Sequence, residues 1–299
     1  MSILVLGTVA LDSVTTPHGT RKALLGGSAV HFSMSCRLFT DVHLVAIVGR
    51  DFPARHIDFL KRKGLVLTSL IRSDGKTFRW EGEYKGDLNS ALTKKTELGV
   101  LLSFCPDVHA SQRGIRNVFL ANVDPEIQAR LLDCMRSPRL VGLDSMNYWI
   151  HTKRKELVAL FPRVDIYVAN EQEARDLTGE HNLIKAAKGL SRLGAKMVLV
   201  KKGEHGVLFY CKDFLFSLPA YPVETVVDPT GAGDTFAGGF MGYLSTRKKL
   251  SLAAVKNAIA YGTIAASFNV ERFGVERTCG LSSAELERRL AYFKKMIRL

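Results

Sequence analysis

The sequence has 299 residues, of which 46% are hydrophobic and 24% are charged, as expected of a globular protein with a large buried core. Lysine and arginine number 42 against 29 aspartates and glutamates, which gives a net charge of +13. The basic residues are scattered in twos and threes, and the chain has no zinc-finger spacing, aromatic RNA-binding signature or basic tail, so we do not expect nucleic acid as a partner.

Short apolar runs alternate with helical patterns along most of the chain. Buried strands are predicted at residues 3–6, 43–48, 117–121, 140–143, 164–169 and 197–200. Helices are predicted between them at residues 28–39, 54–63, 125–136, 153–160, 171–177 and 183–193. This alternation predicts an α/β fold, in which a mainly parallel sheet is covered by helices on both faces.

Two segments interrupt this alternation. Residues 77–84 alternate like a strand and, with residues 69–71 and the turn signal at Ser73-Asp74-Gly75, indicate a β-hairpin. We therefore predict a small β-sheet lid formed by residues 13–25 and 68–90, inserted in a single domain that spans residues 1–299. In the C-terminal third we predict a strand at 214–218, helices at 234–244, 252–268 and 283–298, and a strand around Val275.

The N-terminus and the cysteines bear on the location of the protein. Residues 1–11 are apolar without a preceding basic residue, which indicates a buried first strand and not a signal peptide. No uncharged apolar run approaches the ~18 residues that span a bilayer. Five cysteines at wide spacing fit neither a disulfide framework nor a zinc site. We expect a cytoplasmic protein with no membrane partner.

The strongest chemical signal is the segment from Asp228 to Asp234, which contains Gly231-Ala232-Gly233 and leads into a predicted helix. Small residues at a helix start leave backbone N–H groups bare, and these groups form a pocket for an anion such as phosphate. The segment is neither a Walker-type loop nor a dinucleotide-binding motif. Asp234 at the mouth of the pocket is either a helix-end charge or a catalytic base, and its position alone does not decide between them.

This segment and three others, in the same order, resemble the signatures of the ribokinase-like carbohydrate kinases, the phosphofructokinase-B family. The three others are Gly26-Gly27-Ser28-Ala29, Asn170-Glu171-Gln172-Glu173 and Lys202-Gly203-Glu204-His205-Gly206. The resemblance covers nearly the whole chain and implies a three-layer α/β/α sandwich with a lid. It also implies an ATP- and Mg²⁺-dependent kinase that transfers the γ-phosphate to an alcohol group of a small sugar-type substrate, with a nucleoside as the alternative.

The resemblance implies a role for each matched residue. Asp234 would be the base that accepts the proton of the substrate hydroxyl, beside an anion hole formed by Gly231, Ala232 and Gly233. Glu173 would orient Mg²⁺, mainly through water, and Asp228 would lie near a loop for a monovalent cation such as K⁺. Substrate contacts are implied for Asp12, Gly26 and Gly27. Nucleotide contacts are implied for Asn170, Lys202, Gly203, Gly206, Thr230 and Asn257.

Further substrate candidates remain open. His31 stands where the family signature has Asn, so it could donate to a hydroxyl, stack on a base or be a core histidine. Arg79 and Trp80 lie on opposite faces of the lid strand, and alternation does not say which one covers the site. Four second-rank candidates follow strands, where α/β sheets bind ligands: Asn122 and Asp124 after one strand, and Asp144 and Asn147 after the next.

Two other functional classes are disfavoured. A non-catalytic binding protein on the kinase fold is a poor match for a chain that keeps Asp234, Glu173 and the Gly231–Gly233 segment. A nucleic-acid binder has only the net charge in its favour. The resemblance leaves the oligomeric state open, with a homodimer formed through the lid as one option.

Overall fold

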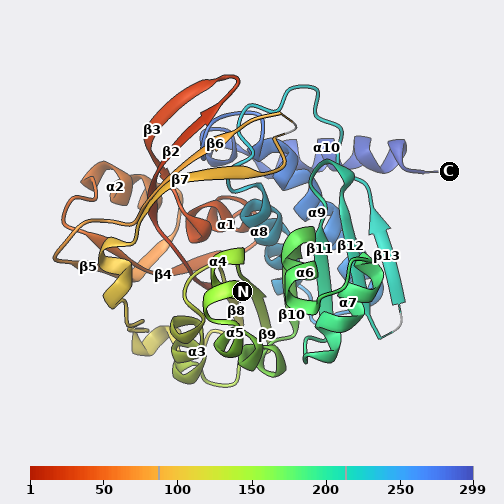
Figure 1. The fold of residues 1–299 in the computed structure, drawn as a ribbon, viewed down its shortest axis with the longest axis horizontal. Helices are drawn as coiled ribbons and strands as arrows, with labels where there is room; N and C mark the ends of the chain where they lie inside the picture. The colour runs from red at the N-terminus through yellow and green to blue at the C-terminus, as the bar shows by residue number, and fades with distance from the viewer. Residues whose placement is uncertain (87, 213, 299) are drawn as a thin grey trace.

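Two β-sheets of different size organise the chain (Figure 1). The computed structural model describes residues 1–86, 88–212 and 214–298; Asp87, in the predicted lid, lies outside them. The larger sheet contains β1 (Ser2–Leu6), β4 (Asp41–Gly49), β5 (Val66–Ser73), β8 (Asn117–Leu120), β9 (Leu140–Asp144), β10 (Ile166–Asn170), β11 (Met197–Lys201), β12 (Val207–Cys211) and β13 (Phe214–Leu218). Their order is β13-β12-β11-β10-β9-β8-β1-β4-β5, and all neighbours from β5 to β11 are parallel.

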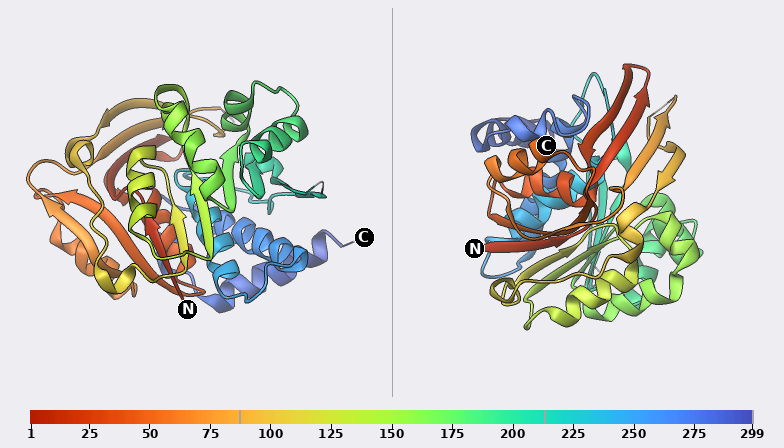
Figure 2. Two further views of the ribbon diagram at one scale, coloured as in Figure 1. Left: turned by 90° about the horizontal axis from the view of Figure 1, so that it is seen from below. Right: turned by 90° about the vertical axis from the view of Figure 1, so that its left-hand side faces the viewer.

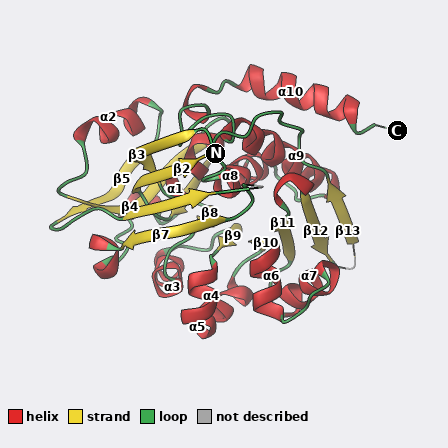
Figure 3. Cartoon of the chain, turned by 45° about the horizontal axis from the view of Figure 1, so that its top comes forward, coloured by secondary structure: helices red, strands yellow, loops and turns green. Residues whose placement is uncertain are grey.

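Helices cover both faces of this sheet, as the sequence predicts (Figure 3). One face carries α1 (Ser28–Cys36), α2 (Ala54–Arg62), α8 (Ala232–Ser245), α9 (Leu252–Asn269) and α10 (Ser283–Met296). The other carries α3 (Pro125–Cys134), α4 (Asn147–Thr152), α5 (Arg154–Leu160), α6 (Glu171–Thr178) and α7 (Leu183–Arg192). Strand β1 shows the cause: Ile3 and Val5 point into one core, whereas Leu4 and Leu6 point into the other. The predicted three-layer α/β/α architecture is confirmed.

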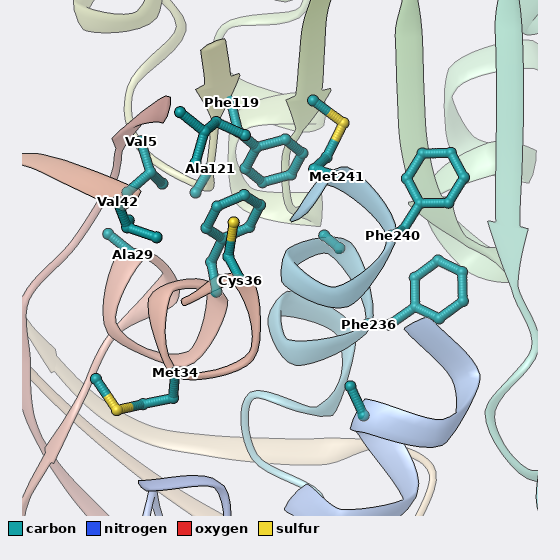
Figure 4. Packing of buried hydrophobic residues seen from close by; sticks show 14 of the residues in the cluster. Val5, Ala29, Met34, Cys36, Val42, Phe119, Ala121, Phe236, Phe240 and Met241 are labelled. Atoms are coloured by element: carbon teal, nitrogen blue, oxygen red, sulfur yellow. The ribbon is translucent and has the colours of Figure 1, made fainter. Parts of the chain in front are cut away.

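The close packing of α1 against α8 fixes the helix that begins at the predicted anion pocket (Figure 4). A Cβ atom at Gly238 would lie 2.1 Å from the Phe32 carbonyl oxygen, so only glycine permits this approach. Phe32 in turn stacks on Phe119 of β8, with ring centroids 4.4 Å apart. Because α8 is anchored to the sheet in this way, its N-terminus is held rigidly at the sheet edge.

The smaller sheet is the predicted lid, but its composition differs from the prediction. It contains β2 (Ala10–Thr16), β3 (Gly19–Gly26), β6 (Arg79–Tyr84) and β7 (Ala91–Glu97), in the order β3-β2-β6-β7, and it projects from the body (Figure 2). The predicted hairpin between residues 69–71 and 77–84 is wrong, because β5 pairs with β4 in the larger sheet and β6 pairs with β2 and β7. The turn at Ser73 instead leads from one sheet to the other.

The C-terminal prediction differs from the structure at one strand, and two other predictions agree with it. The helix predicted at 153–160 is α5, which follows the short helix α4 after a single residue. The strand predicted around Val275 is a turn, because the chain there folds back toward Asp228. Within the described ranges, the helices lack the length and apolar character needed to cross a bilayer.

Candidate active site

The residues singled out by the motifs gather where the parallel strands of the larger sheet end. Because β8, β9, β10 and β11 run parallel to β1, their carboxyl ends share one edge of the sheet. Polar residues end three of these strands: Asp144 in β9, Asn170 in β10 and Lys201 in β11. The strand order reverses at β1, which lies between β4 and β8, and open α/β sheets bind ligands at such a switch point.

The segment from Asp228 to Asp234, here called the anion loop, leads into α8. Asp228 is fully buried, and its carboxylate accepts hydrogen bonds from the N–H groups of Thr230 at 2.9 Å and Gly274 at 2.8 Å. These bonds tie the loop to the turn after α9. The Asp228 side chain is therefore first of all an anchor of the anion loop.

Open backbone donors lie at the start of α8. Gly231 precedes the helix in the left-handed conformation (φ 72°), and no side chain caps this end by a hydrogen bond within the described chain. The Ala232 N–H donates to the Pro229 carbonyl at 3.1 Å. This bond within the loop occupies the Ala232 donor, so it is not open to an anion. The N–H groups of Gly231, Gly233 and Asp234 have no backbone partner among the described residues. With the positive end of the helix dipole, they can hold an anion.

Three carboxylates and one lysine face one another beside the anion loop. The Lys201 ammonium donates to Asp144 Oδ2 at 3.0 Å, and the side chains are 19% and 4% exposed. The surroundings raise the pKa of Asp234 from 3.8 to about 7, first by burial and then through the charge of Asp144, while Lys201 opposes the shift. With Glu173 included, negative charge exceeds positive charge in this cluster.

Asn170 and Glu173 form a reciprocal cap at the start of α6. The Asn170 side chain accepts from the Glu173 N–H at 2.8 Å, and the Glu173 carboxylate accepts from the Asn170 N–H at 2.7 Å and from Asn170 Nδ2 at 2.8 Å. Burial raises the pKa of Glu173 to about 8; the charge of Asp144 adds to this shift and Lys201 opposes it. Glu173 is thus both a structural cap and a member of the acidic cluster.

Asp12 of the lid strand β2 joins the same site from the other side. Its Oδ2 accepts from the N–H of Gly27 at 3.1 Å, and a Cβ atom at Gly26 would lie 2.0 Å from that oxygen. Burial raises the pKa of Asp12 from 3.8 to about 7, and the charges of Asp228 and Asp234 add to the shift. The residues predicted for substrate and for catalysis therefore lie within electrostatic reach of one another.

The lid contacts both ends of the site. On the substrate side, the Tyr84 hydroxyl lies 3.3 Å from Thr230 Oγ1 of the anion loop. On the other side, Asn89 Nδ2 donates to Glu204 Oε1 at 3.3 Å, in the turn after β11 predicted to border the nucleotide. The lid thus contacts the anion loop at one end of the site and the predicted nucleotide turn at the other.

The ring of His31 packs against the anion loop and supports it. A Cβ atom at Gly231 would lie 2.2 Å from His31 Cγ, so the ring packs directly against the glycine. His31 Nδ1 lies 3.2 Å from Asn269 Oδ1, which also accepts from Thr235 Oγ1 at 2.9 Å, while Asn269 Nδ2 donates to the Thr230 carbonyl at 2.8 Å. Because that carbonyl can only accept, the amide orientation is fixed, and His31 Nδ1 must carry the proton.

Comparison with known proteins identifies the family. The model of the "pfkB family carbohydrate kinase" matches residues 13–279. The chain belongs to the pfkB family of carbohydrate kinases. The predicted family resemblance is therefore confirmed, and the protein is a phosphotransferase of the carbohydrate and nucleoside kinase type, a family that uses ATP.

Individual pfkB kinases match over most of their length. A cytidine kinase from Thermococcus kodakarensis is 32% identical over 256 residues, which cover 84% of this chain and 91% of that protein. A ribokinase from Haemophilus influenzae is 32% identical over an alignment of 317 residues, which covers 96% and 97%. In fold, a putative ribokinase II from E. coli, solved in complex with ATP and Mg²⁺, has a TM-score of 0.79 at 18% identity, covering 97% of this chain and 99% of that one.

Three other predicted site residues of this pfkB kinase make their described side-chain contacts outside the acidic cluster, although the Asn122 carbonyl accepts from Ser28 Oγ of the first motif at 3.0 Å. Arg79 forms an ion pair with Asp51 at 2.7 Å, which holds it beside the body. Asn122 Oδ1 accepts from the Trp149 indole at 3.1 Å. Asn257 is half-buried, lies about 18 Å along α9 from Asn269, and contacts Lys294 of α10 at 3.5 Å. No described contact joins these three predicted residues to the acidic cluster.

The turn after β11 has the shape that its glycines predict. Lys202 donates its N–H to the Gly206 carbonyl at 2.7 Å, and both Gly203 (φ 54°) and Gly206 (φ 89°) adopt the left-handed region. A Cβ atom at Gly206 would lie 2.0 Å from the Leu218 carbonyl oxygen. These glycines therefore fix a tight turn, while their proposed contact with a nucleotide stays a prediction.

Two members of the site are not among the sequence candidates. Lys201 closes the otherwise apolar strand β11, and a lone charge at the carboxyl end of a buried strand was a signal for it. Asn269 ends α9 and is fully buried, but nothing in its local sequence marks it, since its partner His31 is 238 positions away.

We expect Asn269→Ala to destabilise the protein by about 2–5 kcal/mol, because it leaves the buried groups of His31, Thr230 and Thr235 without their shared partner. The free energy of unfolding in urea measures this. The matched control is Asn257→Ala on the same helix, where a half-buried side chain with one 3.5 Å contact to another helix is removed and a change within about 0.5 kcal/mol is expected. Equal losses in the two variants would contradict the supporting role of Asn269.

Proposed function

We propose that this protein transfers the γ-phosphate of ATP to an alcohol group of a small sugar or nucleoside, with Asp234 as the base. The observation that carries the proposal is the position of Asp234. It lies in the first turn of α8, among open N–H donors, and interacts with Asp12 on the substrate side and with Asp144 and Lys201 on the other. A base beside an anion site is the arrangement that phosphoryl transfer to a hydroxyl requires.

In this mechanism Asp234 accepts the proton of the substrate hydroxyl as its oxygen attacks the γ-phosphorus. A pKa raised to about 7 makes the carboxylate a stronger base while leaving it largely ionised above neutrality. The Gly231, Gly233 and Asp234 N–H groups would donate to the phosphoryl oxygens and stabilise the charge that develops there. Asp12 would accept from substrate hydroxyls and orient them.

The residues present also suit Mg²⁺. Asp144, Glu173 and Asp234 supply hard carboxylate oxygens. Burial chiefly raises the pKa values of Glu173 and Asp234, and the charge of Asp144 adds negative charge that a cation would offset. Glu173 would hold the ion, mainly through water, since Mg²⁺ keeps several waters and few protein ligands. When bound, Mg²⁺ neutralises charge on the phosphates and helps to orient them.

Two relatives guide the choice of substrate. The names cytidine kinase and ribokinase share a ribose unit, which favours a ribose-containing acceptor. His31 adds a constraint: its pKa is lowered by burial, its Nδ1 proton is donated to Asn269, and its buried Nε2 has no partner among the described residues. A substrate group that reaches Nε2 would therefore have to be a donor, such as a hydroxyl.

A direct test is ADP release with ATP and Mg²⁺ against a panel of sugars and nucleosides that includes ribose and cytidine. We expect turnover with at least one ribose-containing compound and none when Mg²⁺ is chelated. Preference for cytidine over ribose would favour the nucleoside class, and the reverse would favour the sugar class. The absence of turnover on every compound, with ATP still bound, would favour a non-catalytic binding protein.

A further inference from the structure

The proposed mechanism gives no role to the charge of Lys201. Lys201 ends β11, and its Nζ atom donates to Asp144 Oδ2 at 3.0 Å. The lysine side chain is only 19% exposed, so its charge is largely removed from water. The cost of removing a lysine from water offsets much of the energy gained in a single ion pair. The pair with Asp144 therefore does not by itself explain a largely buried lysine at this position.

Lys201 also lies against the anion loop. A Cβ atom at Gly233 would lie 2.9 Å from Lys201 Nζ, so the ammonium group sits directly beside the second residue of α8. Gly233 is one of the residues whose N–H has no backbone partner in the described chain. The absence of a side chain at Gly233 therefore leaves the lysine and the helix N-terminus facing one space.

The charge of Lys201 is maintained there. The ammonium group donates to Asp144 Oδ2 at 3.0 Å and interacts with the carboxylates of Glu173 and Asp234, and these negative charges favour its charged form. A permanent cation is unfavourable at the positive end of a helix. The same cation and the open N–H groups become favourable neighbours once an anion lies between them.

We propose that Lys201 is a catalytic residue that donates hydrogen bonds to the γ-phosphoryl group during its transfer, and that Asp144 positions it. The proposal rests on the proposed kinase function. In the step, the substrate oxygen gives its proton to Asp234 and forms the new O–P bond, while the bond from γ-phosphorus to the bridging oxygen breaks and ADP leaves with the electron pair. Lys201 keeps its protons throughout and stabilises charge on the phosphoryl oxygens.

The position of Lys201 favours a contact with the γ-phosphoryl group of ATP over the other two phosphates. Asp234 must lie beside the attacking hydroxyl, and that hydroxyl must lie beside the γ-phosphorus. Lys201 interacts with Asp234 and adjoins Gly233, the residue directly before it. The neighbouring residue Lys202, predicted from the motif to contact the nucleotide, starts the turn that follows and shows no described contact with the cluster.

The test compares binding of ADP with binding of the non-hydrolysable β,γ-imido analogue of ATP, both with Mg²⁺, by calorimetry. Lys201→Met keeps the length of the side chain and removes its charge. We expect it to weaken the analogue about tenfold or more but ADP less than about twofold, and to lower kcat about 10²- to 10³-fold. The control Lys196→Met removes an exposed lysine, paired with Asp165 at 2.7 Å just before β11, and should change neither affinity.

The ratio of the two affinities separates the alternatives. If Lys201 only neutralises the carboxylates, Lys201→Met will change both affinities alike, or neither, and the proposal is overturned. Should Lys201→Met not fold, Lys201→Gln is measured by the same ratio. Failure of the wild-type protein to bind or turn over ATP would refute the proposed function itself, which is a different result from an unchanged ratio in an active enzyme.

Discussion

Replacing Asp234 by Asn is expected to abolish turnover and to make the protein more stable at pH 8. Loss of the base should lower kcat about 10³-fold or more, while ATP binding stays largely intact because the backbone donors remain. The gain in stability follows from the raised pKa of Asp234, which means that the folded protein disfavours the charged carboxylate. Asn has the same shape without that charge. We expect a gain of about 1–3 kcal/mol at pH 8.

The sign of the pH dependence is defined by the two pKa values. In the unfolded chain Asp234 ionises near 3.8, and in the folded protein it ionises near 7. The penalty on the folded wild type therefore grows as pH rises from about 4 to 7 and is constant above that range. The difference in free energy of unfolding between Asp234→Asn and wild type should therefore increase over about the same pH range and then stay constant. Urea unfolding at about pH 4.5, 6 and 8 measures it.

A surface variant provides the control for this experiment. Asp133 is exposed and pairs with Arg163 at 2.7 Å, so Asp133→Asn should leave kcat unchanged and shift stability by less than about 0.5 kcal/mol at any of these pH values. Turnover of Asp234→Asn within tenfold of wild type would reject its role as the base. A variant less stable than wild type at pH 8 would show that the folded protein favours the charge.

The arrangement of the larger sheet could be predicted because its signals are local. Each buried strand is an apolar run, and each helix between strands has its own periodicity, so their alternation defines the three layers. The anion loop is predictable for the same reason. The small residues Gly231 and Gly233 lie next to the start of the helix, and α8 begins at Ala232, within two residues of the predicted start at Asp234.

The lid could not be predicted in full, because its pairing partners are distant and its surface is polar. Strand β6 pairs with β2, whose residues lie more than 60 positions earlier, and nothing in either segment encodes that register. Strand β7 is exposed along most of its length and reads Ala91–Glu97 with little apolar alternation, so the hydrophobic pattern misses it. The turn signal at Ser73 is compatible with a hairpin and equally with a connection between two sheets.

The site shows the same limit at the level of single residues. Lys201 and Lys202 are adjacent, and the motif points to the second, but only the three-dimensional structure shows that the first meets Asp144. For His31 the sequence leaves open a contact with a substrate hydroxyl, stacking on a base and a position in the core. Its contacts with Gly231 and Asn269 depend on α1, α8 and α9 converging, which no local pattern reveals.

Replacing Gly231 by Ala is expected to damage both stability and turnover. Gly231 has φ 72°, a conformation that strains other residues, and a Cβ atom there would lie 2.2 Å from the ring of His31. The ring cannot yield easily, because Asn269 holds it and the surrounding helices are closely packed. The loop must therefore move away and carry its N–H donors with it. We expect a loss of about 2–4 kcal/mol in urea unfolding and a fall in kcat of about 100-fold or more.

Gly179 supplies a matched control, because it ends α6 with nearly the same backbone angles (φ 73°, ψ 6°) but has nothing within 4 Å of an added Cβ atom. Gly179→Ala should lose only the conformational part, about 1 kcal/mol, with kcat unchanged. Adding His31→Ala to Gly231→Ala removes the clash, so the two changes should be coupled in a double-mutant cycle by about 1 kcal/mol or more. Equal effects of the two glycine substitutions, or additivity in the cycle, would show that the His31 ring does not support the anion loop.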